Sequence, residues 1–246
     1  MKLKTLVADR QIVRPGDVLA VVEDEEVKYA RYPDKHVFIM NSKVYADVVG
    51  LASIGEGSVS VIPLEGTYIP RKDDLVIGVV TGVGITAWIL DINSPYKAVL
   101  PGEDVVEGFN PAVHELRGYL DLGDYVLAKV AEFDRTRDPL LTIRGKGLGK
   151  IIDGTVVKVR ASKVPRLIGR KGSMYNLLTS ATGCDITIAQ NGLVRLKCND
   201  ERTIETLVKA IRIIESKSHI RGLTEEIKAF LERELGARSD AKAHQG

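Results

Sequence analysis

The chain has 246 residues, of which 44% are hydrophobic and 28% charged, and this composition excludes a disordered or collagen-like protein. Such a length suits two or three small domains better than a single core. With only two cysteines, four histidines and a net charge of +2, a disulfide-rich scaffold and a Cys-x-x-Cys metal site are also excluded. No apolar run is long enough to span a membrane, and residues 1–9 lack the apolar core of a signal peptide, so we expect a cytoplasmic protein.

Positive charge is concentrated in one window, residues 135–172. This window contains eleven basic and two acidic residues, a net charge of +9, so the rest of the chain carries −7. Charge segregated in this way indicates a surface that faces a polyanion on an otherwise acidic body. The alternative is a set of solvated loops whose charges point in several directions.

Residues 1–66 predict a small β-domain. A Pro15-Gly16 turn is followed by a strand, residues 37–49 predict a hairpin with a polar turn at 41–43, and residues 58–64 predict a further strand. A domain of this size is barely able to bury a core of its own, so we expect it to pack on its neighbour or to dock on a partner.

Residues 67–146 predict a second β-unit. Strands are expected at 74–81, 85–92, 97–101, 123–130 and 140–144, with a short helix at 110–117. This order fits a five-stranded Greek-key barrel of the OB type. The basic, glycine-rich stretch 144–150 does not end in the Gly-Lys-Ser/Thr of a P-loop, and we predict a flexible hinge there.

Segments 76–80, 87–91, 123–130 and 133–135 resemble an S1 domain, an OB-fold that binds single-stranded RNA. The S1 pattern usually has an aromatic pair on the second strand. Trp88 matches the later aromatic position, but Ile85 stands at the earlier one. Trp88 and Tyr96 are candidates to stack bases, at roughly 1–3 kcal/mol each. The alternative for Trp88 is a place in the barrel core, because Ala87 and Ile89 flank it on the other face of the strand.

Residues 150–236 predict a domain of order β-α-α-β-β-α with one more helix behind it. The sequence Ile168-Gly169-Arg170-Lys171-Gly172 lies between the first two helices, and Asp200 is the expected cap of the third. This arrangement matches a type I KH domain, whose Gly-x-x-Gly loop holds ~4 nucleotides of backbone. The glycines allow close approach, and the helix start offers unpaired N–H groups to a phosphate.

The hairpin of this unit has two possible registers. A two-residue loop at 191–192 mixes apolar and polar faces, whereas a three-residue loop at 190–192 separates them. The second register pairs Ile186 with Leu196, Ile188 with Val194, Thr187 with Arg195, Asp185 with Lys197 and Cys184 with Cys198 on the core side. For the cysteines we expect a buried thiol pair, and a disulfide mainly if the source is a hyperthermophile.

A last helix is expected from a cap at Thr224 to Gly236, with residues 237–246 disordered. The whole chain up to this point resembles the ribosomal RNA processing protein 4 family, RNA-binding cap subunits of the archaeal RNA exosome. The resemblance is carried by residues 45–50, 62–66, 73–78, 95–98 and 163–169.

The resemblance implies a non-catalytic subunit without a cofactor. Three copies would sit on a six-membered ring of RNase-PH-type subunits and guide the 3′ end of single-stranded RNA into a central pore for 3′-to-5′ degradation and processing. The N-terminal domain would lie on the ring, the S1 domains around the pore and the KH domains outside. The residues themselves agree, because no carboxylate cluster, activated nucleophile or metal-ligand set emerges.

The candidate RNA-binding residues come from both predicted RNA-binding domains. They are Lys97, Arg135, Arg137, Trp88 and Tyr96 in the S1 unit, and Lys163, Arg166, Ile168, Gly169, Arg170, Lys171 and Gly172 in the KH unit. Whether the Gly-x-x-Gly loop touches RNA or packs on a neighbouring domain stays open.

Two other classes of protein combine S1 and KH domains. A polynucleotide-phosphorylase-type enzyme also carries KH and S1 domains, but there two catalytic domains come first and KH precedes S1. A transcription elongation factor of the NusA kind runs S1 then KH, but it has two KH domains, and the residues after Ser218 are too few for another.

Overall fold

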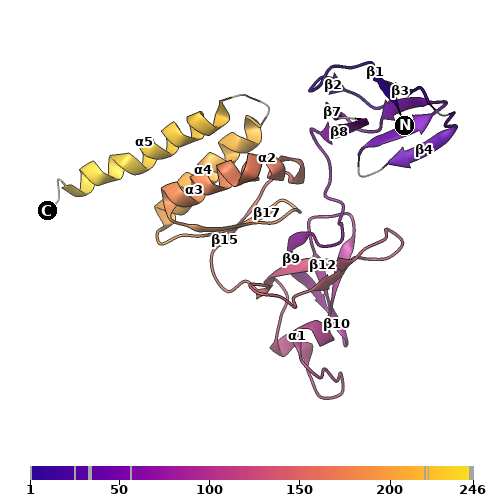
Figure 1. Cartoon of the computed structure of the whole chain (residues 1–246). Helices are drawn as coiled ribbons and strands as arrows, with labels where there is room; N and C mark the ends of the chain where they lie inside the picture. The colour runs from indigo at the N-terminus through magenta and orange to yellow at the C-terminus, as the bar shows by residue number, and fades with distance from the viewer. Residues whose placement is uncertain are drawn as a thin grey trace. The chain divides into compact units, whose positions relative to one another are not determined.

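The computed structural model describes residues 2–24, 26–32, 35–55, 57–218, 220 and 222–243. The chain divides into two compact units, residues 1–66 and 67–246, which are described separately (Figure 1).

The first unit is made of two antiparallel sheets around a shared apolar core. One has the strand order β1-β3-β6-β5-β4 and the other β2-β7-β8. The strands are β1 (Leu3–Thr5), β2 (Ile12–Val13), β3 (Val18–Val22), β4 (Tyr29–Tyr32), β5 (Val37–Met40), β6 (Lys43–Ala46), β7 (Gly50–Gly55) and β8 (Ser58–Pro63). The hairpin predicted over 37–49 is confirmed: Met40 pairs with Lys43 across a two-residue turn in which Asn41 and Ser42 both have positive φ.

The second unit begins with a closed barrel. Its strands are β9 (Leu75–Val83), β10 (Ala87–Asp91), β11 (Lys97–Pro101), β12 (Tyr125–Glu132), β13 (Leu140–Thr142) and β14 (Gly149–Lys150). The order β13-β11-β10-β9-β12-β14, with β13 pairing β12 as well, closes five strands on themselves and confirms the predicted OB-type barrel.

Trp88 lies in the centre of this barrel. Its side chain is 0% exposed, and its indole N–H donates a hydrogen bond of 2.9 Å to the carbonyl of Leu120. The prediction that Trp88 stacks bases is therefore wrong, because no part of the ring can reach a ligand. The alternative, a core residue, is confirmed.

The helix predicted at 110–117 is replaced by turns. The helical segments here are α1 (Gly102–Val105) and the 3-10 turn η1 (Leu116–Gly118). Asn110 accounts for the difference, because its side-chain carbonyl accepts the N–H of Ala112 and its backbone N–H donates to His114. Local bonds of this kind compete with the helical pattern.

The predicted hinge over 144–150 is anchored at both ends. Arg144 forms an ion pair of 2.8 Å with Asp104 and donates to the carbonyl of Glu103. At the other end β14 pairs with β12, and Lys150 lies 2.6 Å from Asp124. This hydrogen bond holds the pKa of the Asp124 carboxyl below its usual range. The segment is thus fastened to the barrel rather than free to bend along its whole length.

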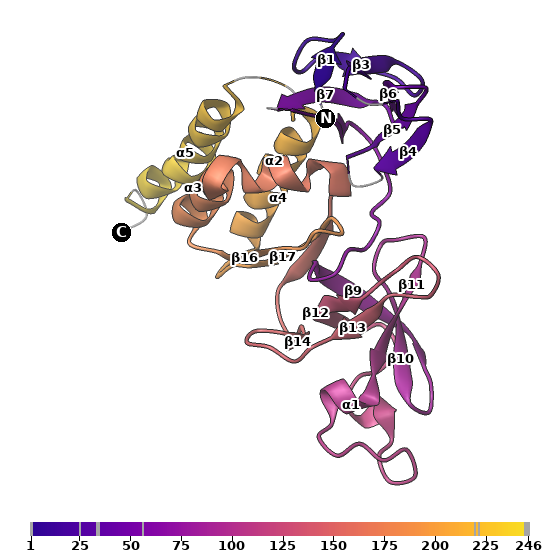
Figure 2. The same ribbon diagram turned by 45° about the vertical axis from the view of Figure 1, so that its right-hand side comes forward.

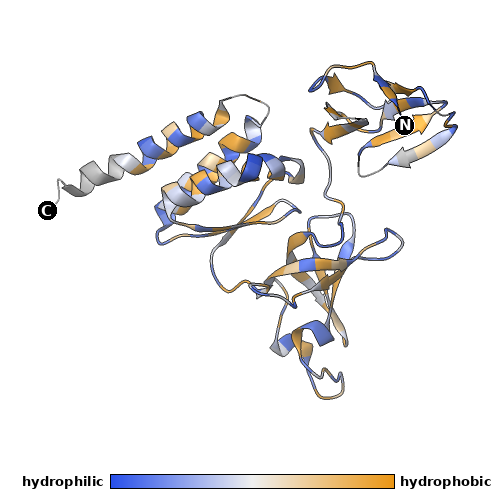
Figure 3. Ribbon diagram, viewed as in Figure 1, coloured by the Kyte–Doolittle hydropathy of each residue, from blue (hydrophilic) through white to orange (hydrophobic). Residues whose placement is uncertain are grey.

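The remainder of the second unit has the predicted KH order (Figure 2). A sheet of order β15-β17-β16 is covered on one face by helices. The sheet and these helices share one apolar core. The elements are β15 (Thr155–Lys158), η2 (Ala161–Lys163), α2 (Val164–Ile168), η3 (Arg170–Gly172), α3 (Ser173–Thr182), β16 (Asp185–Ile188), β17 (Leu193–Lys197), α4 (Glu201–Ser216) and α5 (Leu223–Ala243). In Figure 3, apolar and polar residues alternate around α3 and α4, as expected for helices with one buried face.

The predicted register of the β16–β17 hairpin is confirmed. Ile186 pairs with Leu196 and Ile188 with Val194, and the Ala189 N–H donates to the carbonyl of Leu193, so the loop is Gln190-Asn191-Gly192. Asp200 caps α4 as predicted, because its carboxylate accepts the backbone N–H of Thr203.

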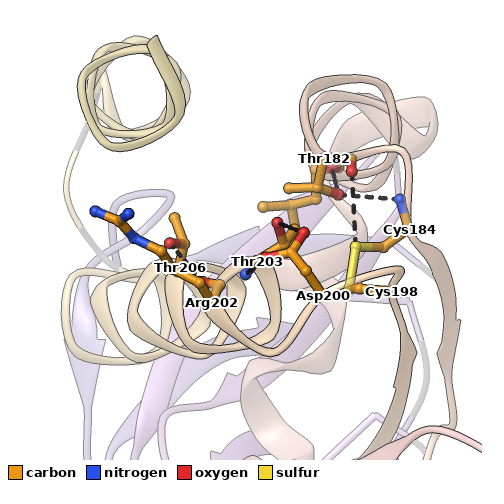
Figure 4. The surroundings of a disulfide bond; sticks show 8 residues. Thr182, Cys184, Cys198, Asp200, Arg202, Thr203 and Thr206 are labelled. Carbon is orange, nitrogen blue, oxygen red and sulfur yellow. Dashed lines mark hydrogen bonds between the residues drawn. A yellow bond between two sulfur atoms is a disulfide. The ribbon is translucent and has the colours of Figure 1, made fainter. Parts of the chain in front are cut away.

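The cysteines form a disulfide, Cys184–Cys198, with Cα atoms 4.6 Å apart (Figure 4). The expectation of a free thiol pair is therefore wrong. The hairpin register brings the two sulfurs together at the open end of the hairpin, and Cys184 is 5% exposed. The bond ties the end of α3 to the start of α4, since Thr182 contacts Cys184 and Asp200 follows Cys198 closely.

We expect this bond to stabilise the KH unit by about 3 kcal/mol, because it closes a loop of about fifteen residues in the unfolded chain. Replacing both cysteines by serine should lower the free energy of urea unfolding by that amount. The unsubstituted chain should lose the same amount in a reducing buffer. If oxidised and reduced chains unfold at the same urea concentration, the bond has no stabilising role.

The last helix differs from its predicted bounds. α5 begins at Leu223, one residue before the expected cap, and continues to Ala243, past Gly236. Leu223, Ile227 and Leu231 bury its inner face on the KH core. Within the tail predicted to be disordered, residues 244–246 lie outside the described part of the chain.

Candidate RNA-binding surfaces

Cations from two segments meet at one end of the barrel. Lys97 begins β11, and Arg135 and Arg137 lie in the loop between β12 and β13. Strand β13 pairs with β11 at Leu140 and Val99, which brings that loop beside Lys97. All three side chains are exposed. The structure therefore groups the three S1 cations predicted from sequence, and we call this region the basic end.

Two further cations at this end were missed by sequence reasoning. Arg71 and Lys72 are exposed in the turn before β9. The backbone N–H of Asp73 donates to Val130 in β12, so the turn lies at the same end of the barrel. Asp74 closes the turn by accepting from the Arg71 N–H and the Tyr68 hydroxyl. Burial and the Asp74 carboxylate raise the pKa of Tyr68. Only the closure of the barrel, which sequence does not display, brings this turn to the basic end.

Tyr96 lies among these cations and is half-buried. Its ring meets Phe133 edge to face, with centroids 4.8 Å apart. This contact ties the segment before β11 to the β12–β13 loop. In that loop Asp134 accepts from the N–H and hydroxyl of Thr136, and these bonds hold the pKa of the Asp134 carboxyl below its usual range. The loop that carries the cations is thus ordered by its own side chains.

The Gly-x-x-Gly loop has the geometry that its glycines predict. Gly169 has a φ of 77°, and a Cβ there would lie 2.6 Å from the backbone nitrogen of Met174. Lys171 itself has a φ of 52°, in the left-handed region. Arg170 and Lys171 are exposed, and no hydrogen bond or ion pair of the described residues involves either side chain. Both charges are therefore available to a phosphate.

The other KH candidates are less accessible. Lys163, Arg166 and Ile168 are each half-buried. Arg166 donates to the carbonyl of Ile220, 3.1 Å away, which ties α2 to the segment before α5. This bond gives Arg166 a structural contact in addition to any role in binding.

The tip of the β16–β17 hairpin docks into the barrel and forms a joint between the S1 and KH units. Asn191 is 0% exposed. Its amide nitrogen donates to the carbonyls of Ile77 and Ile92 at 2.7 and 2.8 Å, and its amide oxygen accepts from the Ile77 N–H at 3.4 Å. Asn93 completes the contact by donating to the Asn191 carbonyl.

Apolar and backbone contacts support this joint. Ile77 of the barrel packs with Ala189 and Leu193 of the KH hairpin in a small core of their own. The Gln190 N–H donates to the carbonyl of Leu75, at the start of β9. The joint thus lies beside the basic end of the barrel. Sequence reasoning placed Asn191 in a turn and did not detect its role, because asparagine before glycine is itself a turn signal.

A metal-binding cluster is not found where the structure describes the chain. Within the described ranges, no group of three His, Cys, Asp or Glu side chains could hold a metal ion. The described helices also include none that is long and apolar enough to cross a bilayer. What the described surface offers is exposed positive charge on two folds that both accommodate nucleic acid.

Three family models match consecutive parts of the sequence. They are the exosome RNA binding protein RRP4 N-terminal domain over residues 10–65, the exosome complex component RRP40 S1 domain over residues 68–145 and the KH domain over residues 154–216.

Known proteins match over nearly the whole chain. The exosome complex component Rrp4 of Thermosphaera aggregans is 62% identical over 238 residues, which cover 96% of each chain. The protein of the same name from Saccharolobus solfataricus is 44% identical over 237 residues, covering 96% of this chain and 93% of that one. The crystal structure of a provisionally assigned exosome complex RNA-binding protein superposes with a TM-score of 0.67 and 46% identity, over 70% of this chain and 99% of the other.

Proposed function

Because this chain belongs to the Rrp4 family of exosome components, we propose that it is a non-catalytic RNA-binding subunit of an exosome. The observation that carries the proposal is the succession of an Rrp4-type N-terminal domain, an S1 barrel and a KH domain in one chain. The subunit would work in the cytoplasm and would contribute RNA binding to a complex whose nuclease sites lie on other subunits. Incubated alone with poly(A) RNA and phosphate, the chain should leave the RNA at full length.

Single-stranded RNA would bind through its phosphates at the basic end of the S1 barrel. Lys97, Arg135 and Arg137 are exposed there beside the half-buried ring of Tyr96. The joint at Asn191 holds the KH unit next to this end, so one strand could pass from one unit to the other. Binding of this kind depends on counterion release and should weaken steeply as salt rises.

The RNA bound in this way would be guided, with its 3′ end leading, into the pore of a ring of RNase-PH-type subunits. Three copies of the chain would form the cap of such a ring. The S1 barrels would then surround the pore, so that the basic end of each barrel meets the entering strand.

The N-terminal unit would dock on the ring through the outer face of the β2-β7-β8 sheet. Ile12, Leu51 and Ile62 lie side by side on this face, because Ile12 pairs with Leu51 and Leu51 with Ile62. Ile12 is 64% exposed and Ile62 is 40% exposed. A row of apolar side chains on the surface of a small sheet is typical of a protein interface.

We expect the substitution Ile62→Asp to abolish co-purification with the ring subunits, because it places a charge at one end of the apolar row, on the proposed docking face. RNA affinity of the free chain should be unchanged. The matched control is Ile89→Asp on the barrel, where the original side chain is similarly exposed, at 43%. If Ile62→Asp assembles as well as the unsubstituted chain, the docking face is elsewhere.

A further inference from the structure

A groove of about 590 Å³ lies on the KH unit, away from the Gly-x-x-Gly loop. It runs between strand β15 and the first turns of α4. Thr155, Cys198, Ile204 and Val208 line its apolar part, and Asp200, Glu201, Glu205 and Lys209 line its charged part. Neither the proposed RNA contacts nor the proposed ring contacts use this groove.

Strand β15 presents an open edge beside the groove. It is the outermost strand of its sheet, and within the described residues it pairs with β17 and with no other strand. The Val159 N–H donates to the carbonyl of Gly192. In an antiparallel pair every second residue points its backbone groups at the partner strand, so Val157 also bonds to β17. Val156 and Lys158 therefore direct their backbone groups outward. Arg212 donates to the carbonyl of Lys158 at 3.0 Å, and no hydrogen bond of the described residues reaches the outward N–H or carbonyl of Val156.

The exposed charges of α4 follow a self-complementary order along this edge. Glu201 and Glu205 lie in its first two turns, and Lys209 follows one turn later. All three are exposed, and no ion pair of the described residues includes them. Ile204 and Val208 lie between the charges and are half-buried. A second α4 running antiparallel would place its Lys209 near Glu205 of the first, and its Glu205 near Lys209.

We propose that the edge formed by β15 and α4 pairs with the same edge of a second copy of this chain. A twofold axis brings identical surfaces together, so a surface with opposite charges on either side of an apolar centre is complementary to itself. The two β15 strands would pair antiparallel at Val156 and join two KH sheets into one, while Ile204 and Val208 of both copies fill the groove. RNA is a poor occupant, because the carboxylates of Asp200, Glu201 and Glu205 line the groove and would repel phosphate.

The test is the mass of the free full-length chain in analytical ultracentrifugation at total concentrations from the low micromolar to several hundred micromolar. We expect the mass to rise from that of one chain, 26.9 kDa, toward twice that value. Glu205→Lys and Lys209→Glu should each weaken dimerisation at least tenfold, because each places like charges opposite one another. The double substitution that exchanges the two charges should restore dimerisation to within about threefold.

The control is Glu225→Lys, which makes the same charge change at an exposed site on α5 and should leave dimerisation unchanged. Circular dichroism shows whether each variant is folded. A chain that stays monomeric over the whole range, or single variants that dimerise normally, would overturn the proposal, as would failure of the charge exchange to rescue. The measurement uses neither RNA nor ring subunits, so its outcome is independent of the proposed exosome role.

Discussion

Replacing Asn191 by alanine is expected to lower the free energy of unfolding by about 3 kcal/mol. The substitution removes the amide that satisfies the carbonyls of Ile77 and Ile92, and leaves those buried acceptors without a donor. Urea unfolding followed by circular dichroism measures the change. The control, Asn199→Ala, removes an exposed asparagine from the same unit and should change stability by less than about 0.5 kcal/mol.

Gly192 tests how closely the tip of the hairpin packs on the rest of the KH unit. Gly192→Ala should destabilise by more than Gly183→Ala, although both glycines have positive φ. A Cβ at Gly192 would lie 2.2 Å from the carbonyl oxygen of Val159, whereas a Cβ at Gly183 would meet open space. Equal effects of the two asparagine substitutions would show that the tip of the hairpin is not a rigid joint with the barrel. Equal effects of the two glycine substitutions would show that the tip is not closely packed on Val159 and Ala161.

Removing the three predicted S1 cations should have the largest effect on RNA binding. The triple substitution Lys97→Ala, Arg135→Ala and Arg137→Ala should lower affinity for a poly(A) oligonucleotide by about 100-fold at low salt. It should also reduce the slope of log affinity against log salt by about 2, because each lost phosphate contact removes about 0.7 from that slope for single strands. Fluorescence anisotropy across a salt series measures both quantities.

The control variant loses the same number of positive charges, but at sites on helices away from the barrel. Arg202, Lys228 and Arg233 are exposed on α4 and α5, and replacing all three by alanine should leave the salt slope nearly unchanged. A separate variant with Arg170→Asp and Lys171→Asp reports on the Gly-x-x-Gly loop. The proposed RNA path through the barrel fails if the S1 triple variant and its control bind equally well.

The secondary structure of the KH unit was predictable because its patterns have a single physical solution. Only one hairpin register separates apolar from polar side chains, and that register is the observed one. The chemical state of the cysteines was not predictable in the same way. A buried thiol pair and a disulfide require the same register. A register that places Cys184 opposite Cys198 therefore does not distinguish the reduced from the oxidised state.

The candidate site was predicted in part. Each failure concerns a residue whose role depends on tertiary contacts between segments far apart in the sequence. Trp88 matched an aromatic position of the S1 pattern, but whether a residue faces the inside of a barrel depends on how the sheet closes. The grouping of Arg71 and Lys72 with the S1 loop cations depends on the same closure. The role of Asn191 depends on the docking of the KH hairpin on the S1 barrel, and an Asn-Gly turn dipeptide gives no indication of that contact.

The most direct test is the mass of the complex that forms when this chain is mixed with the two kinds of exosome ring subunit. Native mass spectrometry should show three copies of the chain on each ring of six subunits, and the assembled complex should shorten poly(A) RNA from its 3′ end. If the chain remains at 26.9 kDa beside an intact ring, it is not a cap subunit of that ring.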